Sequence, residues 1–238
     1  MIIIGHRGAR AEAPENTLSG FQLAVKSGIR DFELDVQLSK DGQLVVLHDP
    51  TVNRTTGQQG HVSSFTQREL GKMDARKNAA PWPVFQAIPT LKEVLESVPF
   101  ECTFQIEVKT DRKTKLLKLC SELVLIFAEL NLYDRAWITS SDTKILKRMK
   151  LVAPNIRTGL VAEHRFPCPV KKAVNLGCVM LVGKFTLLTR RVVHLAHEKA
   201  LHVSAWTVNE MAVAERLVGA GVDSIITDYP TSMKTYFS

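Results

Sequence analysis

The chain has 238 residues, of which 45% are hydrophobic and 23% are charged, values typical of a globular protein with room for one large domain. Its net charge is +7, and the positive charge is concentrated in residues 109–172, which carry 14 Lys/Arg against 6 Asp/Glu. This segment could attract an anionic substrate, a membrane surface or nucleic acid. Alternatively, its basic residues form the solvated face of a helix. The four widely spaced cysteines argue against a disulfide scaffold, and no apolar run is long enough to cross a bilayer. The basic residues are not interleaved with aromatic ones, as a groove for single-stranded nucleic acid would require.

The chain begins with a short apolar segment, which is too short for a secretion signal and is the first of several strand candidates. We therefore expect a cytoplasmic protein without stable membrane insertion. Short apolar strands then alternate with amphipathic helices, a pattern typical of a parallel α/β protein. The strand candidates number eight, as a closed (β/α)8 TIM barrel requires: residues 2–4, 31–37, 104–108, 136–139, 157–161, 178–182, 202–207 and 224–227.

Helix signals lie between these strands. The helices predicted with most support cover residues 18–27, 91–97, 116–130 and 210–218. Thr90 and Glu93 have the spacing of a capping box at the start of the second of these helices, and Asn209 precedes the last as a predicted N-cap. The loops between the elements are short, with one exception.

The interval between residues 48 and 104 is too long for an ordinary strand-to-helix connection. It contains a turn at residues 54–57, a short helix beginning at Thr66 and a Pro-Trp-Pro stretch at residues 81–83. We interpret about residues 50–88 as an insertion over the C-terminal mouth of the barrel, between its second and third strands. No linker or internal repeat divides the chain, so residues 1–238 are predicted to form a single domain.

The second strand candidate carries acidic residues on one face only. Period-two alternation places Phe32, Leu34 and Val36 on one face and Glu33, Asp35 and Gln37 on the other. The third candidate places Glu107 and Lys109 on the corresponding interior face. Three carboxylates inside a barrel are costly unless a positive group neutralises them, and a hard divalent cation with oxygen ligands does so. The alternative is that some of these charges lie at a solvated strand end or pair with lysine.

Two histidines lie at strand ends near these carboxylates. His6 ends the first strand, and His48 ends a short apolar segment that an Asp41-Gly42 turn joins to the second strand. A two-residue loop would place His48 opposite Asp35, whereas a four-residue loop would place it opposite Glu33. Either register brings a histidine to the level of the carboxylates, where it could transfer protons near neutral pH.

Short motifs are spread along nearly the whole chain, and each one alone is a weak signal. In chain order they are Gly5-His6-Arg7-Gly8, Pro14-Glu15-Asn16-Thr17, Glu33-Leu34-Asp35-Val36, Lys40-Asp41-Gly42, Val46-Leu47-His48-Asp49, Arg54-Thr55-Thr56-Gly57, Ile106-Glu107-Val108-Lys109, Ala205-Trp206-Thr207-Val208-Asn209, Gly221-Val222-Asp223 and Thr227-Asp228-Tyr229-Pro230. Their joint occurrence in this order is specific. On these motifs the chain resembles the glycerophosphodiester phosphodiesterase family, and in particular its compact cytosolic bacterial-type members.

The resemblance implies a metal-dependent enzyme that hydrolyses glycerophosphodiesters, such as deacylated phospholipids, to sn-glycerol 3-phosphate and an alcohol. It implies that Glu33, Asp35 and Glu107 bind one divalent ion, Mg²⁺ or Ca²⁺, with Mn²⁺ a further candidate. By the same resemblance, His6 and His48 are the catalytic acid and base, in an order that the sequence does not set.

The resemblance also implies how the substrate is held. Arg7 and Lys109 would bind the phosphate, and Trp206 would form a wall of the substrate pocket. Glu15 and Asn16 would shape the mouth beside the first histidine. The expected partner is a small-molecule glycerophosphodiester rather than nucleic acid, and the oligomeric state is left open.

One position departs from the family pattern. The fourth strand usually ends in Ser-Phe, whereas this chain has Ser140-Ser141, so an aromatic wall is missing and the preferred alcohol stays open. One alternative function is a related barrel phospholipase acting on intact lipids, which would need an apolar rim such as Val84-Phe85. The other is a non-catalytic phosphate-binding barrel, against which the two histidines argue.

Overall fold

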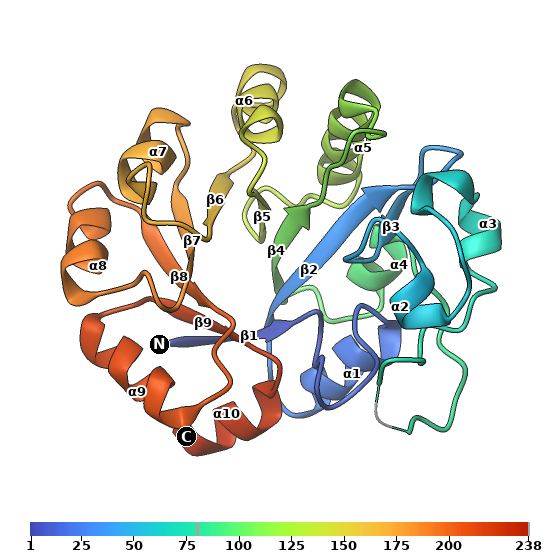
Figure 1. Ribbon diagram of the computed structural model, residues 1–238, viewed down its shortest axis with the longest axis horizontal. Helices are drawn as coiled ribbons and strands as arrows, with labels where there is room; N and C mark the ends of the chain where they lie inside the picture. Colours follow the sequence, from blue (N-terminus) through green and yellow to red (C-terminus); the bar gives the residue numbers. More distant parts are fainter. Residues whose placement is uncertain (80, 238) are drawn as a thin grey trace.

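The computed structural model describes residues 1–79 and 81–237 and confirms the expected (β/α)8 TIM barrel (Figure 1). Parallel pairing of β1 with both β2 and β9 closes the barrel, and β3 pairs antiparallel with β2 outside the closed ring. The strands are β1 (Ile2–His6), β2 (Asp31–Leu38), β3 (Leu44–Val46), β4 (Thr103–Val108), β5 (Ala136–Ser140), β6 (Thr158–Ala162), β7 (Met180–Lys184), β8 (His202–Trp206) and β9 (Ser224–Thr227).

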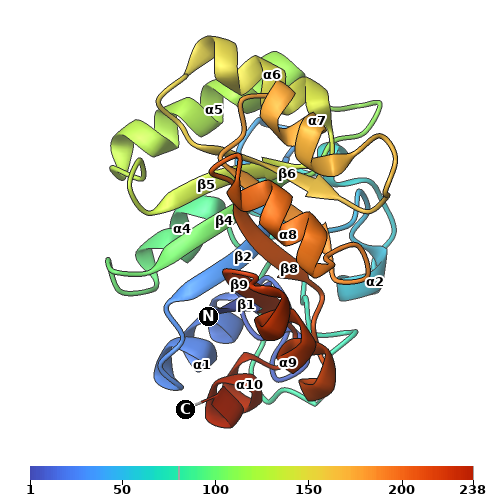
Figure 2. The same ribbon diagram turned by 90° about the vertical axis from the view of Figure 1, so that its left-hand side faces the viewer.

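Helices surround the strands, as Figures 1 and 2 show from two directions. They are α1 (Leu18–Lys26), α2 (Asn53–Thr56), the 3-10 helix η1 (Val62–Ser64), α3 (Gln67–Leu70), α4 (Leu91–Glu96), α5 (Leu116–Glu129), α6 (Thr143–Val152), α7 (Pro169–Asn175), α8 (Arg190–His197), α9 (Met211–Ala220) and α10 (Pro230–Phe237). None of the helices in the described ranges is long and apolar enough to cross a membrane.

The predicted capping box of α4 is confirmed. The Thr90 hydroxyl accepts from Glu93 N at 3.1 Å, and the Glu93 carboxylate accepts from Thr90 N at 2.7 Å. The prediction for Asn209 is wrong, because Glu210 is the N-cap of α9 and makes no side-chain cap. The Asn209 side chain instead hydrogen-bonds to Asp228, a contact between distant segments that local sequence rules do not reveal.

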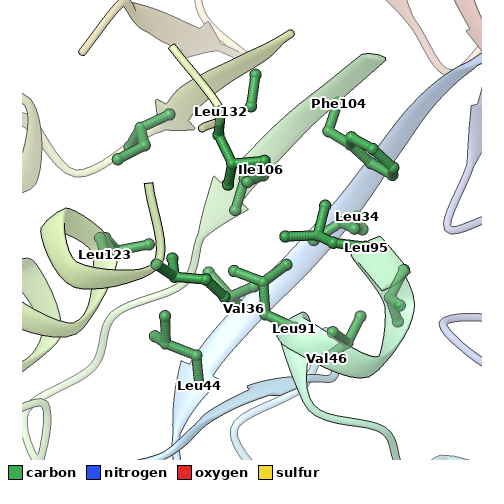
Figure 3. Close-up of a cluster of buried hydrophobic side chains, with 14 of the residues drawn as sticks. Leu34, Val36, Leu44, Val46, Leu91, Leu95, Phe104, Ile106, Leu123 and Leu132 are labelled. Carbon is green, nitrogen blue, oxygen red and sulfur yellow. The ribbon is translucent and has the colours of Figure 1, made fainter. Parts of the chain in front are cut away.

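The outward faces of the strands pack against the helices in a dry layer. Leu34 and Val36 of β2 and Ile106 of β4 are fully buried, and Figure 3 shows them beside Leu91 of α4 and Leu123 of α5. Full burial of each such side chain contributes about 1.5–3 kcal/mol. Because strand side chains alternate, fixing this apolar face outward directs Glu33, Asp35 and Glu107 into the barrel.

The hairpin between β2 and β3 has neither of the two predicted registers. Leu38 pairs with Leu44, which leaves residues 39–43 as the turn. Gly42 has φ of 83° and serves as the left-handed residue of a longer turn, rather than as part of a two-residue loop. The ladder ends before His48, which therefore lies just beyond the strand instead of opposite a carboxylate.

The segment from β3 to β4 holds α2, η1, α3 and α4, and residue 80 of the expected insertion lies outside the described residues. A small apolar cluster of its own supports this segment, with Val52, Val62 and Leu70 fully buried. The Thr51–His61 bridge closes its first loop. The segment follows directly after His48, so its folding fixes where that histidine lies.

Candidate active site

The acidic residues of β2 and β4 meet at the carboxyl ends of the strands. Asp35 is the strand partner of Glu107, and Glu33 lies two residues before Asp35 on the same face. One oxygen from each of the three carboxylates lies within 4.8 Å of the others. Glu33 is 4% exposed and Asp35 is fully buried. The structure therefore brings the three predicted metal ligands together.

This cluster suits a hard cation. Glu33 Oε1 and Asp35 Oδ1 are buried and accept no hydrogen bond from any residue in the described ranges, although Lys109 Nζ forms an ion pair with Asp35 Oδ1 at 3.2 Å. Among the described residues, Arg7 and Lys109 form ion pairs with Asp35 or Glu107, and His6 Nε2 lies 3.7 Å from Glu33, so the three carboxylates face two permanent positive charges. Oxygen donors with unused lone pairs in a dry setting are the donor set that Mg²⁺, Ca²⁺ and Mn²⁺ bind.

The electrostatics of the three carboxylates differ. Burial raises the pKa of Glu33, and the neighbouring charges of Asp35 and Glu107 raise it further. Burial also raises the pKa of Glu107, against the opposing influence of Lys109. Burial acts the same way on Asp35, but Arg7 and Lys109 outweigh it and hold its pKa well below the usual range. Asp35 is thus the fixed charge at the centre of the cluster.

His6 is held between a carboxylate of the last strand and the acidic cluster. Its Nδ1 lies 2.5 Å from Asp228 Oδ1, and its Nε2 lies 3.7 Å from Glu33 Oε2. Burial lowers the pKa of His6, and the contact with Asp228 opposes that shift. Asp228 in turn accepts hydrogen bonds from Asn209 Nδ2 at 2.8 Å and Arg10 Nη1 at 3.2 Å. The imidazole is therefore oriented with Nε2 toward the carboxylates.

His48 has a similar arrangement on the other side of the cluster. Its Nδ1 lies 2.6 Å from Asp49 Oδ1, and Arg54 Nε donates to the other oxygen of Asp49 at 2.6 Å. Gln37 Nε2 donates to the carbonyls of His48 and Asp49, at 3.2 and 2.6 Å. Burial lowers the pKa of His48, whereas the charge of Asp35 raises it. Both histidines are thus held through Nδ1 by a neighbouring carboxylate.

Arg7, Glu15 and Asn16 form a buried network behind Asp35. Arg7 Nε lies 3.1 Å from Asp35 Oδ2, and Arg7 Nη1 donates to Glu15 Oε1 at 2.8 Å. Asn16 Nδ2 donates to Asp35 Oδ2 at 3.0 Å, and Arg54 Nη1 donates to Glu15 Oε2 at 2.7 Å. Glu15 and Asn16 are only 3% and 2% exposed. They fix the cluster from behind.

Lys109 and Trp206 complete the set of predicted residues. Lys109 Nζ lies 2.6 Å from Glu107 Oε1 and 3.2 Å from Asp35 Oδ1, and these carboxylates raise its pKa although burial opposes the shift. Trp206 ends β8 and donates from Nε1 to Val182 O at 3.2 Å. Its side chain lines a cavity of about 20 Å³ inside the barrel, together with His6, Glu33 and Glu107.

Four residues of this site have no role in the sequence analysis: Asp228, Asp49, Arg54 and Gln37. Asp228 directly follows the last strand, and it therefore lies near a strand end as His6 does. Gln37 belongs to the polar face of β2, and Asp49 and Arg54 lie within recognised motifs. Position at the carboxyl end of a barrel strand is the signal that could have found Asp228.

Known proteins are similar to this chain in sequence and in fold. A model of the Glycerophosphoryl diester phosphodiesterase family matches residues 6–232. A glycerophosphodiester phosphodiesterase of Caldanaerobacter subterraneus subsp. tengcongensis is 34% identical over 233 residues, which cover 98% of this chain and 96% of that relative. Lysophospholipase D GDPD1 of Mus musculus is 31% identical over 271 residues, which cover 99% of this chain and 85% of that relative.

A solved structure has a fold similar to that of this chain. The Oleispira antarctica phosphodiesterase OLEI02445, in complex with the product sn-glycerol-3-phosphate, has a TM-score of 0.89 and 26% identity, covering 100% of this chain and 96% of that one. The barrel, its acidic cluster and these relatives together define a phosphoric diester hydrolase. The chain belongs to the glycerophosphoryl diester phosphodiesterase family.

Proposed function

We propose that this protein hydrolyses glycerophosphodiesters to sn-glycerol 3-phosphate and an alcohol, with one divalent metal ion and with His6 and His48 as the proton-transfer groups. The observation that carries the proposal is the acidic cluster with two histidines beside it, each held through Nδ1 by a carboxylate. The product bound by the Oleispira antarctica relative supports the proposed substrate class.

The metal would be held by Glu33, Asp35 and Glu107. Mg²⁺ or Ca²⁺ fits an all-oxygen site best, and Mn²⁺ has compatible chemistry. When bound, such an ion neutralises charge on the phosphodiester and lowers the barrier to attack at phosphorus. Arg7, which pairs with Asp35 at 3.1 Å, would add positive charge beside the ion.

The two histidines would share the proton transfers. Phosphodiester cleavage needs one group to remove a proton from the attacking hydroxyl and another to protonate the departing alkoxide. The side chains of His6 and His48 are 8% and 33% exposed, so the two differ in access to solvent. Burial lowers the pKa of both, which keeps a neutral imidazole available near neutral pH.

The substrate would lie across the C-terminal mouth. Lys109, whose side chain is 24% exposed, would contact the phosphate from the side of β4, and Arg7 would add charge from below. Trp206, at the end of β8, would form a wall of the pocket. Glu15 and Asn16 would act by holding Arg7 and Asp35. A cytoplasmic location stays a prediction from the sequence.

The test is release of sn-glycerol 3-phosphate from purified glycerophosphodiesters. Activity should disappear after chelation and return with Mg²⁺, Ca²⁺ or Mn²⁺. A variant with His6 and His48 both changed to alanine controls for contaminating enzymes. Full activity in thoroughly metal-stripped protein would contradict the metal site, and no release from any glycerophosphodiester would contradict the substrate class.

A second candidate function is cleavage of lysophospholipids at the same phosphodiester position. The name of the mouse relative, lysophospholipase D, and the exposure of Val84 and Phe85 beyond β3 favour it. An acyl chain needs apolar surface near the mouth, and these side chains are 61% and 49% exposed. Adding lysophosphatidylcholine to the assay panel tests this candidate, and cleavage should weaken when both residues are changed to serine.

A further inference from the structure

A second cavity, of about 300 Å³, lies at the mouth between the β5–α6 and β6–α7 connections. Ser141 lines it from the end of β5, Glu163 and Phe166 from the loop after β6, and Lys172 from α7. Val161 borders both this cavity and the small interior one beside Glu33, Glu107 and Trp206. The two spaces are therefore neighbours, separated by the end of one strand.

The charges in this cavity have opposite signs and are not paired. Neither Glu163 nor Lys172 makes an ion pair with any residue of the described part of the chain. Both nevertheless line the same cavity, Glu163 from the loop after β6 and Lys172 from α7. The other lining residues include the imidazole of His164 and the apolar side chains of Leu160 and Pro169. An occupant that carries both a cation and an anion would satisfy both charged groups at once.

We propose that this cavity holds the leaving alcohol of the substrate and favours a zwitterionic one, a hydroxy amino acid of the serine type. The carboxylate of Glu163 accepts hydrogen bonds from the ammonium group, and the ammonium of Lys172 donates to the carboxylate group. Phe166, which is 88% exposed at the rim, presents an aromatic ring to the same space. The inference rests on the proposed hydrolysis of glycerophosphodiesters and names its preferred substrate class.

The distance from the acidic cluster suits an alcohol of this size. Glu107 is the strand partner of Thr139, and Ser141 lies two residues beyond Thr139 at the cavity wall. Neighbouring strands lie about 4.8 Å apart, so the end of β6 is on the order of 10 Å across the mouth from that of β4. A phosphate and a three-carbon alcohol span a gap of that order.

Other alcohols satisfy the cavity less well. Ethanolamine or choline would pair with Glu163 but leave Lys172 without an anion. Glycerol or another polyol would pair with neither by charge. The expected order of kcat/KM is therefore glycerophosphoserine first, glycerophosphoethanolamine second and glycerophosphoglycerol last.

The test combines these three substrates with two variants of the metal-loaded enzyme, Glu163→Gln and Lys172→Gln. Each lost ionic contact at this partly exposed site should lower kcat/KM about tenfold. Glu163→Gln should affect the serine and ethanolamine substrates and spare the glycerol substrate. Lys172→Gln should affect the serine substrate alone. This selective pattern would not arise from a general loss of folding or charge.

Two neighbours provide matched controls. Arg165 lies in the same loop and Lys171 on the same helix, but neither lines this cavity, so Arg165→Gln and Lys171→Gln should leave the substrate order unchanged. Equal effects of Glu163→Gln on all three substrates, no effect of either variant, or a wild-type preference for the glycerol substrate would each overturn the inference. Failure of the wild type on every substrate would instead contradict the proposed function, and the inference would fall with it.

Discussion

His6 Nδ1 and Asp228 Oδ1 lie 2.5 Å apart, although 222 positions separate the two residues in the chain. The contact exists because β1 and β9 pair to close the barrel and bring both strand ends to the mouth. Asp228 opposes the effect of burial on the pKa of His6 and orients the ring so that Nε2 faces Glu33. Asp228 is therefore a positioning residue for a proposed proton-transfer group.

Changing Asp228 to Asn should lower kcat roughly 10²-fold with little change in KM, because His6 loses its orienting charge. Loss of that charge also lowers the pKa of His6 further, so the limb of the pH–rate profile that reports His6 should move to lower pH. In a His6→Ala background the same change should add almost nothing. An equal further loss in that background would show that Asp228 acts independently of His6.

Single changes of His6 or His48 to alanine should each lower kcat by roughly 10²–10⁴-fold, the usual worth of one positioned acid or base. Circular dichroism and the melting temperature should show an intact fold. His194→Ala is the matched control, because this histidine lies on helix α8 and its side chain is 76% exposed. Near-normal turnover in either variant would remove that histidine from the mechanism.

Metal binding should be measurable without turnover. A ligand that binds only the folded state stabilises it by about 2.7 kcal/mol at a hundredfold excess over its Kd. Mg²⁺, Ca²⁺ or Mn²⁺ should therefore raise the melting temperature of the metal-free protein. Glu33→Gln should weaken this effect by raising Kd at least about tenfold, the order of change seen when metal-site partners are altered. An identical metal-induced shift in the variant would place the ion elsewhere.

Glu15 should matter for stability through its buried ion pairs. Contacts with Arg54 and Arg7 hold the pKa of Glu15 well below its usual range, although burial opposes the shift. Removing one partner of a buried ion pair costs about 3 kcal/mol, so Glu15→Gln should lower the melting temperature at pH 7 by about 6–12 °C. Glu101→Gln, which breaks an exposed pair with Arg30, should have almost no effect.

The difference in stability between wild type and Glu15→Gln should depend on pH, with a definite sign. Because the pKa of Glu15 is lower in the folded state than in the unfolded chain, its stabilisation is fully present above the unfolded value of about 4.3. It is lost as the pH falls toward the folded-state value. The gap between wild type and Glu15→Gln should therefore shrink below about pH 4.3, and a gap independent of pH would show that packing rather than charge is responsible.

The barrel and the acidic cluster could be predicted because they depend on local periodicity. Alternation along residues 31–37 places Phe32 and Glu33 on opposite faces, and burying the apolar face forces the carboxylates inward. The hairpin register could not be predicted this way, because Asp41-Gly42 suits turns of several lengths. Only the observed pairing of Leu38 with Leu44 distinguishes them.

Contacts between distant segments were the other part that sequence patterns do not contain. Asn209 has the composition of an N-cap, yet its side chain binds Asp228, because closure of the barrel brings the end of β9 within reach. The side chain therefore forms the tertiary hydrogen bonds instead of capping α9. Arg54 is similar: it belongs to a motif, but its partner Glu15 lies 39 positions away.

The last prediction concerns the nucleophile. We expect turnover to depend on the free glycerol hydroxyl next to the phosphate, which would attack phosphorus internally and give a cyclic phosphate that water then opens. Well-oriented intramolecular reactions reach effective molarities on the order of 10⁵–10⁸ M, which a positioned water is not expected to match. Two histidines suit this two-step reaction, because the base of the first step becomes the acid of the second. A substrate analogue without the 2-hydroxyl should bind, as measured by calorimetry with a His6→Ala variant, but turn over several orders of magnitude more slowly. If the wild type hydrolyses it at nearly the natural rate, water is the nucleophile and the cyclic route is wrong.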